Sequence, residues 1–451
     1  MVDVLRAEVA ELRRQLGSTS RNSSRPPSTD SPFDKPTPKS QRSRSGRQPG
    51  GQPGHPGATL RQVTDPDRVV VHEPAACRCC GQGLAGQPVS RVERRQQFDI
   101  PPVTVSVTEH QLVERECPCG ARTRADAPAG VDAPVQYGPR ITAIIVYLYV
   151  GQFLSKKRTA QALAELFGTP VSEVTVAAVT ARAAGGLQEF LAHVRERIAA
   201  APVAHFDETG LRVQGKLRWV HSASTGRYSL ITVHDRRGRV AMDAAGVLPG
   251  FTGVAVHDAW APYDTYLAVT HALCNAHALR ELQAVTDQTP DGHWCWAEQT
   301  ADALRDLKGL VDAALAADTA GLHTLDQAAL ANALTRYRSA VRIGANATAG
   351  RATKLQAKHH ALARRLITRE ADYLRFTTNP QVSFDNNAAE REIRMIKIRQ
   401  KVSGCLRTLT GAEQFCAIRS YLATARKHDI GFFNALATLA EGRPWLPAPS
   451  Q

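Results

Sequence analysis

The sequence predicts a multidomain α/β protein whose mixed-sheet core is interrupted by an all-helical block. Three observations lead to this prediction: tight cysteine pairs between residues 61 and 132, short β-branched stretches from residue 201 onward, and an Ala/Leu-rich helical pattern over residues 296–375. A basic helix from Ala388 then returns the chain to the core. At about 150 residues per domain, the length corresponds to roughly three folded units.

Changes in composition divide the chain into eight segments. We expect a short coiled-coil helix over 1–17, a disordered basic linker over 18–60, a cysteine-rich domain over 61–132, a helical segment over 133–200, the first part of the core over 201–290, the helical insertion over 291–379, the second part of the core over 380–430 and a C-terminal segment over 431–451.

The first two segments contain little that can form a core. Apolar residues alternate spacings of three and four, as in a heptad seam: Val2, Leu5, Val9, Leu12 and Leu16. Two heptads are marginal alone, so an oligomerising coiled coil and a frayed amphipathic helix both fit. Between Ser18 and Thr59 Phe33 is the single large apolar residue, and the stretch contains seven basic and two acidic residues. We expect a disordered tether, which either follows a DNA backbone or only connects domains.

The net charge and the arrangement of the cysteines restrict the classes of protein to which the chain can belong. Lys and Arg number 56 against 42 Asp and Glu, and this surplus of +14 favours a polyanionic partner. The longest apolar run, residues 141–150, is too short to span a membrane, and the N-terminal residues lack the apolar region of a signal peptide. The nine cysteines are partly clustered, which is typical of metal binding. A cytoplasmic nucleic-acid protein is therefore favoured over a secreted, membrane or disulfide-stapled one.

Two cysteine pairs predict a structural zinc site. Each pair closes a tight turn that ends in Gly, which lets backbone N–H groups face the thiolates. We assign the ligands as Cys77, Cys80, Cys117 and Cys119. Further side chains remain competitors as ligands: Cys79, His72 and His110. Strand-like stretches at 68–72 and 103–113 are expected to flank the pairs.

The helical segment contains a pattern similar to a helix-turn-helix. Residues 158–167 read as a helix that Gly168 ends, and Ser172 can cap the next helix. Lys156 and Lys157 stand at the entry. The pair of helices either contacts DNA or belongs to a plain helical bundle.

Three carboxylates are the candidate catalytic residues. Asp207 and Asp258 each end an apolar strand, and Glu390 lies at the start of the basic helix. Unpaired carboxylates are costly to bury, so they need a cation or a hydrogen-bond network. Strand-Asp, strand-Asp and helix-Glu suit a two-metal phosphoryl-transfer site that holds Mg²⁺ or Mn²⁺.

Each of these carboxylates also has a purely structural interpretation. Either aspartate could accept backbone N–H bonds at a turn, and Glu390 fits the third helical position of a capping box with Asn387 as N-cap. Glu208 should point to the opposite side of its strand from Asp207 and is left out of the site. Weaker alternatives are Asp264, Asp287 and Asp385.

The helix that carries Glu390 is strongly basic. Glu390, Arg394 and Lys397 share one face, so a metal-binding carboxylate would be flanked by phosphate-binding cations. The expected DNA-binding residues are Arg391, Arg394, Lys397, Arg399 and Lys401.

Cys274 and His277 form a C-x-x-H pair after the second aspartate. Two ligands do not make a metal site. We expect both side chains to pack and hydrogen-bond near the carboxylates as active-site support.

Several motifs in the same order resemble the IS66 family of transposases almost from end to end. Two of these motifs lie in the linker, Asn22 to Ser28 and Gly50 to His55. The cysteine pairs are the next motif. The remaining motifs are Tyr137 to Arg140, Phe206 to Thr209, Cys274 to His277, Asp385 to Arg391 and Phe432 to Pro447. Two departures stand out: many relatives read Ser-Asp-Gly where this chain has His257-Asp258-Ala259, and Cys79 is an additional cysteine.

The resemblance implies a DDE transposase with an RNase H-like core and the triad Asp207, Asp258 and Glu390. It implies two Mg²⁺ (or Mn²⁺) ions at the triad, one structural Zn²⁺, and DNA as partner, both transposon ends and target. The 3′-hydroxyls of cut or nicked ends would attack the target DNA. A homo-oligomer, small accessory proteins of the same element and a nucleoid-associated bacterial protein are further implications.

Two other functions fit the residues. One is an RNase H-like nuclease that does not join strands, and strand-transfer products would distinguish it. The other is a non-catalytic zinc DNA-binding protein, which would bind DNA without forming any product.

Overall fold

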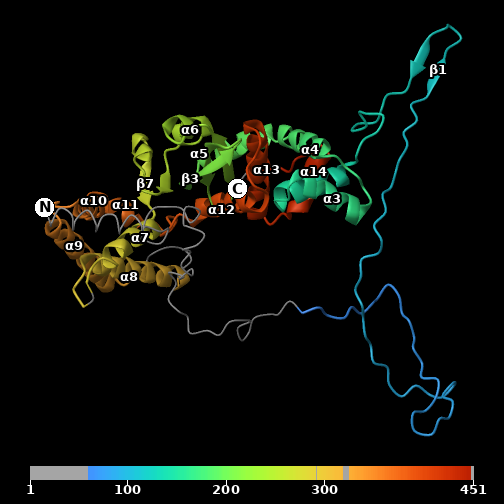
Figure 1. Ribbon diagram of the computed structural model, residues 1–451, viewed down its shortest axis with the longest axis horizontal. Helices are drawn as coiled ribbons and strands as arrows, with labels where there is room; N and C mark the ends of the chain where they lie inside the picture. Colours follow the sequence, from blue (N-terminus) through green and yellow to red (C-terminus); the bar gives the residue numbers. More distant parts are fainter. Residues whose placement is uncertain (1–58, 291, 318–324, 448–451) are drawn as a thin grey trace. The chain divides into compact units, whose positions relative to one another are not determined.

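The computed structural model describes residues 59–290, 292–317 and 325–447 (Figure 1). The predicted coiled coil and nearly all of the predicted linker lie outside these residues. Two compact units divide the chain, one comprising Lys35–Thr104 and the other Met1–Asp34 with Val105–Gln451, and each is described by itself. In the described parts of the chain no helix is both long and apolar enough to cross a bilayer.

The stretches expected as strands beside the cysteines are not strands. Residues 68–72 and 103–113 carry no ladder pairing, and the strands of this region are the short antiparallel pair β1 (Glu114–Glu116) and β2 (Arg122–Arg124). A single bridge joins Ala76 and Gly83. β-branched residues favour an extended backbone, but a strand also needs a partner with its own free backbone groups.

The helical segment begins with α2 (Pro139–Val146) and a π-helical turn, η2 (Tyr147–Gly151). Three further helices follow: α3 (Lys156–Phe167), α4 (Glu173–Gly185) and α5 (Gln188–Ala199). As predicted, α3 ends at Gly168, which has a φ of 59°, and the Ser172 side chain caps α4. The first of these helices starts two residues earlier than predicted, because Ser155 caps it by accepting a hydrogen bond from the Arg158 N–H.

A five-stranded mixed sheet follows, in the order β5-β4-β3-β6-β7. The strands are β3 (Val203–Val213), β4 (Lys216–Ser224), β5 (Ser229–His234), β6 (Val254–His257) and β7 (Thr270–Leu273). Strands β3, β4 and β5 pair antiparallel, whereas β6 pairs parallel with β3 and β7 parallel with β6. The sequence predicts the first four strands but not β7, whose residues Thr-His-Ala-Leu lack the valines that mark the equally short β6.

Several helices pack around the sheet. Between β5 and β7 the chain forms α6 (Arg239–Ala245) and two short turns, η3 (Leu248–Gly250) and η4 (Ala261–Thr265). α7 (Asn275–Thr286) follows β7 directly. After the helical block come α12 (Asn387–Ser403), α13 (Leu409–Lys427) and α14 (Phe432–Ala440). One hydrophobic core joins α13 and α14 to the helices α2 to α5 and to strands of the sheet.

Helix α13 closes the outer edge of the sheet with two hydroxyl groups. The Ser420 hydroxyl accepts a hydrogen bond from the Ile231 N–H at 2.8 Å and donates one to the Ile231 carbonyl at 3.3 Å. The Thr424 hydroxyl does the same for Ser229, at 3.1 and 3.2 Å. These side chains satisfy backbone groups of the edge strand β5 that would otherwise be free to pair with another strand.

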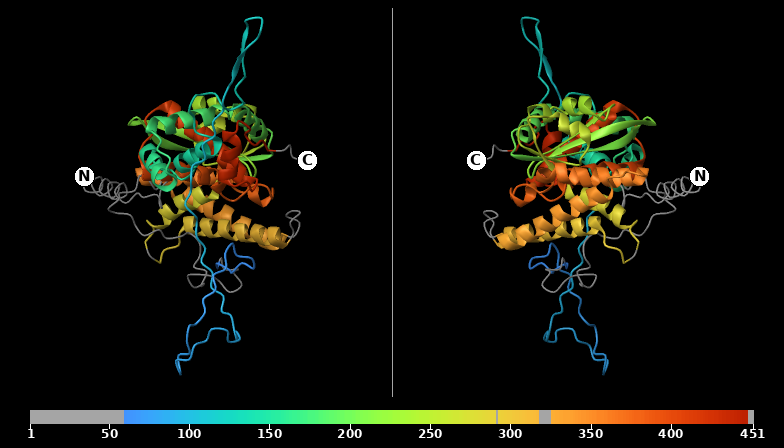
Figure 2. Two further views of the ribbon diagram at one scale, coloured as in Figure 1. Left: turned by 90° about the vertical axis from the view of Figure 1, so that its right-hand side faces the viewer. Right: turned by 90° about the vertical axis from the view of Figure 1, so that its left-hand side faces the viewer.

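Residues 296–377 form helices with a hydrophobic core of their own. They comprise α8 (Trp296–Ala317), α9 (Gln327–Ala347), α10 (Lys354–Thr368), α11 (Glu370–Tyr373) and the turn η5 (Arg375–Thr377). Figure 2 shows the long helices α8 and α9 side by side. Their core is continuous with β6, β7 and α7, so this block packs on the parallel half of the sheet.

The contact between α8 and α9 depends on a glycine. A Cβ atom at Gly344 would lie 2.3 Å from the Trp296 ring, whereas one at Gly309 would meet nothing within 4 Å. Gly344→Ala should therefore lower the free energy of unfolding by about 1–3 kcal/mol through overpacking. Gly309→Ala, the matched control, should raise it by about 0.5–1 kcal/mol through helix propensity. Urea titration of both variants measures the difference, and equal stability would contradict this description of the interface.

Candidate active site

Asp207 and Asp258 come from neighbouring parallel strands at the same level of the sheet. The register pairs Val203 with Val254 and continues to His205 with Val256, and its extension by two residues sets Asp207 opposite Asp258. The sequence argument expected Asp207 at the end of its strand. This detail is wrong, because β3 continues to Val213 in antiparallel pairing with β4.

The acidic groups at this position raise one another's pKa. Burial raises the pKa of the Asp207 carboxyl well above its ordinary value, and the carboxylates of Glu208, Asp258 and Glu390 raise it further. Burial likewise raises the pKa of Asp258. The structure thus brings the three predicted carboxylates into electrostatic contact, although they come from three distant parts of the sequence.

Each aspartate is oriented by one backbone group. Oδ1 of Asp207 accepts a hydrogen bond from the Glu208 N–H at 2.9 Å, and Oδ1 of Asp258 accepts one from the Trp260 N–H at 3.1 Å. The structural interpretation of these residues as turn aspartates is therefore partly correct. It leaves unexplained why two acidic side chains are placed where they disfavour each other's charge.

Glu208 belongs to the same acidic group, although the sequence argument left it out. Arg237 donates to Oε1 of Glu208 through Nε at 3.1 Å and Nη2 at 2.7 Å, and the Tyr263 hydroxyl donates to Oε2 at 2.8 Å. Burial raises the pKa of Glu208 to about 7, and the Asp258 carboxylate adds to this effect. The guanidinium of Arg237 also stacks on the rings of Trp260 and Trp219, at 3.9 and 4.8 Å from the centroids.

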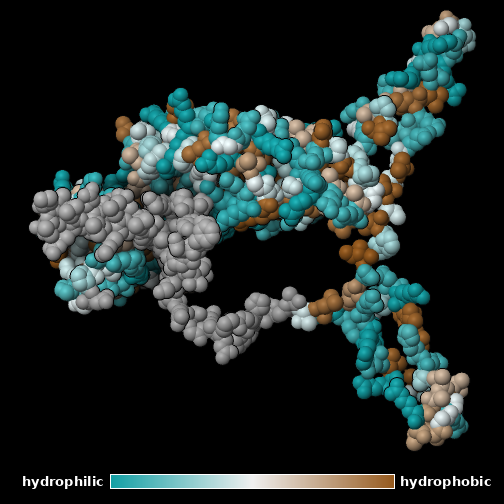
Figure 3. Space-filling model, in the orientation of Figure 1, coloured by the Kyte–Doolittle hydropathy of each residue, from teal (hydrophilic) through white to brown (hydrophobic). Residues whose placement is uncertain are grey.

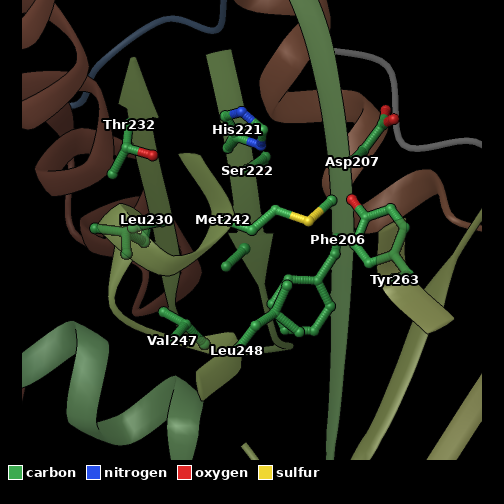
Figure 4. Close-up of a pocket in the computed structure, with 12 residues that line it drawn as sticks. Phe206, Asp207, His221, Ser222, Leu230, Thr232, Met242, Val247, Leu248 and Tyr263 are labelled. Carbon is green, nitrogen blue, oxygen red and sulfur yellow. The ribbon is translucent and has the colours of Figure 1, made fainter. Parts of the chain in front are cut away.

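A pocket lies beside the acidic group, on the apolar side of β3. In Figure 4 Phe206 and Asp207 leave opposite sides of the strand, and Phe206 lies among Met242, Val247 and Leu248. These apolar side chains are part of the hydrophobic core. The lining also includes Asp207, His221 and Tyr263, so the pocket extends from this apolar packing to the edge of the acidic group.

Glu390 is placed by the residue that precedes its helix. The N-cap of α12 is Asn386, not Asn387 as predicted, and its side chain makes no capping bond. The buried Asn386 amide instead donates to the Phe206 carbonyl at 2.7 Å and lies 3.1 Å from Nδ1 of His205. The Asn386 N–H donates to the Cys274 sulfur at 3.2 Å. The bonds of the Asn386 amide to Phe206 and His205 hold the start of α12 against β3, next to Asp207.

The capping-box interpretation of Glu390 is consequently wrong. Glu390 is the fourth residue of α12, and its own N–H donates to the Asn386 carbonyl. Asp385 serves the helix start instead, by accepting a hydrogen bond from the Asn387 N–H at 3.0 Å. The Glu390 side chain is thereby free to face the acidic group, and burial raises its pKa.

Cys274 and His277 lie close to Glu390. One ligand atom each from Cys274, His277 and Glu390 lies within 4.8 Å of the other two. Nδ1 of His277 and Nη2 of Arg280 both lie 3.8 Å from Oε1 of Glu390. Burial lowers the pKa of His277 to about 3, so the imidazole is neutral and Arg280 is the cationic neighbour.

The basic residues of α12 divide into exposed and buried ones. Arg391, Arg394 and Lys401 are exposed, and Arg394 is close enough to lower the pKa of Glu390. Lys397 is half-buried and donates to the Gly210 carbonyl. The prediction that Arg399 binds DNA is wrong. Arg399 is buried, donates a hydrogen bond to the Gly404 carbonyl and stacks on Phe415, so its guanidinium cannot reach DNA.

The weaker acidic alternatives have other partners. Asp264 pairs with Arg369 at 2.8 Å, and the exposed Asp287 accepts a hydrogen bond from the Gln283 amide. Asp385 supports the start of α12. Asp264 and Asp287 therefore stand apart from the acidic group, whereas the Asp385 carboxylate contributes to the raised pKa of Glu390.

The cysteine pairs each form a tight turn. The Gly81 N–H donates to the Cys77 carbonyl and the Gly120 N–H to the Cys117 carbonyl, and both glycines have positive φ, 75° and 84°. Hydrogen bonds within each turn lower the pKa of Cys77 and of Cys119. Both turns thus have the form expected of zinc knuckles, with Gly after the second cysteine. Cys77 and Cys117 belong to separate units of the chain, so each turn is described alone.

Two of the residues that build the site were missed by the sequence argument. Glu208 was excluded by strand alternation, and Asn386 by the assumption that the next asparagine caps the helix. A repeated Asn before a predicted helix is the one available signal for Asn386, since only one of two neighbouring amides can cap. The partners of Glu208 come from two separate connections, Arg237 from the loop before α6 and Tyr263 from η4, whose folds the sequence does not reveal.

The two asparagines provide a matched test of this assembly. Asn386→Ala removes the tie between α12 and β3 and leaves the Phe206 carbonyl unpaired, so we expect a loss of about 1–3 kcal/mol in the free energy of unfolding. Asn387→Ala removes only exposed contacts with Asp385 and should change it by less than about 0.5 kcal/mol. Denaturant unfolding of the two variants provides the comparison, and a larger loss for Asn387→Ala would refute the role given to Asn386.

Comparison with protein families places this geometry in a known group. The model of the transposase IS66 family matches residues 134–414. The model of the zinc-finger binding domain of transposase IS66 matches residues 74–120, which supports a structural zinc at the cysteine pairs. A family of unknown function (DUF6444) matches residues 1–61. A search of curated proteins gave no match. Because the first of these matches covers more than half of the chain, the protein belongs to the IS66 family of transposases.

Proposed function

We propose that the protein is a DNA transposase that binds the terminal inverted repeats of its element and cleaves and joins DNA strands with Asp207, Asp258 and Glu390. One observation carries this proposal: two aspartates share one level of adjacent parallel strands and face a glutamate from α12, and all three have raised pKa values. Such mutual repulsion is unfavourable for stability and is typical of a functional site.

The arrangement of elements supports an RNase H-like core. Three antiparallel strands are followed by two parallel ones, and Asp207 and Asp258 lie on the central pair. Helices α8 to α11 enter between β7 and the helix of Glu390, as expected of a helical insertion over about 291–379. In this proposal the catalytic domain comprises 201–290 and 380–430.

The donor set of the site fits magnesium. The three side chains offer only carboxylate oxygens, the hard ligands that Mg²⁺ and Mn²⁺ prefer. When bound, two such ions would activate the attacking oxygen and stabilise the leaving one. Oδ1 of each aspartate is already held by a backbone N–H, which leaves Oδ2 for the metal.

The other residues of the site hold these ligands in place. Asn386 fixes Glu390 relative to β3, and Trp260 orients Asp258 while its ring stacks on Arg237. Arg237 in turn compensates the charge of Glu208, so this fourth carboxylate does not add a free negative charge to the site. Pre-arranged ligands of this kind lower the reorganisation that catalysis requires.

DNA would lie along the exposed face of α12. Arg391, Arg394 and Lys401 are exposed there, and Figure 3 shows a surface of mainly hydrophilic side chains over the sheet and its helices. The cysteine domain, the linker and the pair α3–α4 would add further contacts. We place the protein at bacterial DNA in the cytoplasm, acting as a homo-oligomer because two ends must be joined, with small accessory proteins of the element as possible partners.

The triad can be tested with labelled DNA ends of the element and purified full-length protein. Without one ligand the site loses several kcal/mol of transition-state stabilisation, so Asp207→Ala, Asp258→Ala and Glu390→Ala should each reduce cleavage by roughly 10³-fold or more. DNA binding, measured by gel shift, should persist. Asp287→Ala, which removes an exposed aspartate outside the acidic group, is the control and should cleave normally.

The products discriminate between functions. Joined strands that depend on Asp207 support the transposase. Cleavage without joining would indicate an RNase H-like nuclease, and retarded but intact DNA would indicate a zinc DNA-binding protein without catalysis. Full activity of any one triad variant would exclude that residue from the site.

The DNA-binding face of α12 can be tested through its salt dependence. Replacing one phosphate contact weakens binding to all sequences and reduces the slope of log Kd against log salt by about one. We expect this for Arg394→Gln and for Arg391→Gln. Arg342→Gln, an exposed arginine of α9, is the charge-matched control. An equal decrease in slope for all three variants would mean that only the total charge matters. It would contradict the assignment of DNA binding to α12.

A further inference from the structure

Cys274, His277 and Glu390 form a compact group that the proposed reaction does not need as a whole. Their ligand atoms lie within 4.8 Å of one another, which is close enough for one ion to touch all three. Cys274 is the residue before α7, His277 lies in the first turn of that helix, and Glu390 lies in the first turn of α12. The group therefore spans two helix starts that Asn386 holds together.

One polar atom of this group lacks the partner of an ordinary hydrogen-bond network. Nδ1 of His277 is buried and has no hydrogen-bond partner among the described residues. It faces Oε1 of Glu390 at 3.8 Å, too far for a hydrogen bond. A buried ring nitrogen is normally paired, so an unpaired one directed at a carboxylate indicates a missing ligand.

The sulfur of Cys274 is oriented by a backbone group, because it accepts a hydrogen bond from the Asn386 N–H at 3.2 Å. Hydrogen bonds from the surrounding chain orient metal ligands and tune a metal site. The i, i+3 spacing of Cys274 and His277 lets both side chains of one helical turn reach the same ion.

The chemistry of the three donors selects the kind of ion. A thiolate, an imidazole and a carboxylate are ligands of Zn²⁺, whereas Mg²⁺ prefers oxygen ligands alone. Three protein ligands leave a fourth tetrahedral position open to water. Arg280 is the nearest cation, at 3.8 Å from Oε1 of Glu390, and its charge opposes those of the thiolate and the carboxylate.

We propose that Cys274, His277 and Glu390 bind a zinc ion, and that this ion withdraws Glu390 from the magnesium site and so inhibits strand cleavage. The arrangement of these three side chains supports the zinc site by itself. The inhibition rests on the proposed function, since it assumes that Glu390 is a magnesium ligand. The site is separate from the zinc knuckles, whose ligands are other cysteines.

Zinc content of the full-length protein tests the site without any activity measurement. After incubation with zinc chloride and removal of free metal, the wild type should retain two zinc ions per chain, one at the knuckles and one here. Cys274→Ala and His277→Gln should each retain one. Cys416→Ala is the matched control, because Cys416 is an equally buried thiol in α13, away from the group.

Replacement of zinc by Co²⁺ adds a readout of the ligands. The absorption band of cobalt bound to thiolate should lose part of its intensity in Cys274→Ala and keep it in Cys416→Ala. Equal metal content in the wild type, Cys274→Ala and His277→Gln would overturn the site. An equal loss in Cys416→Ala would also overturn it, since the loss would then reflect disturbed folding.

Inhibition is measured separately, as cleavage in magnesium buffer at increasing zinc chloride concentrations, with each protein compared with its own zinc-free rate. Zinc should inhibit the wild type and Cys416→Ala, and the half-inhibitory concentration should rise at least tenfold in Cys274→Ala. The same half-inhibitory concentration in all three would overturn the inhibition. If neither the wild type nor any variant cleaves DNA, the proposed function is wrong. The zinc content of the proteins then still tests the zinc site.

Discussion

The buried amide of Asn386 is the contact on which the site depends. It bonds to His205 and Phe206 of β3, and its backbone N–H bonds to the sulfur of Cys274. Three segments that are far apart in the sequence therefore meet at one side chain. Asn386 thus positions the helix of Glu390 relative to the two aspartates, which the register of β3 and β6 places.

The acidic group itself is a weakness in the fold. Asp207, Glu208, Asp258 and Glu390 all have raised pKa values, so the folded chain disfavours charges that water would accept. Among the described residues only Glu208 has a close cation, Arg237 at 2.7 Å, while Arg280 lies 3.8 Å from Glu390. A fold that was selected for stability alone would replace such residues, which is the usual conflict between stability and activity at functional sites. The same repulsion makes the position attractive to divalent cations.

Local patterns in the sequence predict much of this fold, and the failures share one cause. The strands β3 to β6, the end of α3 at Gly168 and the Ser172 cap follow from residue types and spacing within a few neighbours. The mid-strand position of Asp207, the pairing of Glu208 with Arg237 and the inward-facing Asn386 depend on partners from other segments. The same holds for residues 103–113, which have a strand-like sequence but no partner strand. Arg399 looks like its exposed neighbours until the packing of α13 is known.

The hydroxyl groups of α13 also have a consequence for how the protein is made. Ser420 and Thr424 protect the edge strand β5 from residues that lie 189 and 195 positions later in the chain. While the protein emerges from the ribosome, that edge therefore stays open until α13 has been synthesised. Open strand edges are where newly made chains associate wrongly. Each nascent copy must be kept apart from its neighbours on the same messenger RNA during this interval, by chaperones or by the spacing of ribosomes.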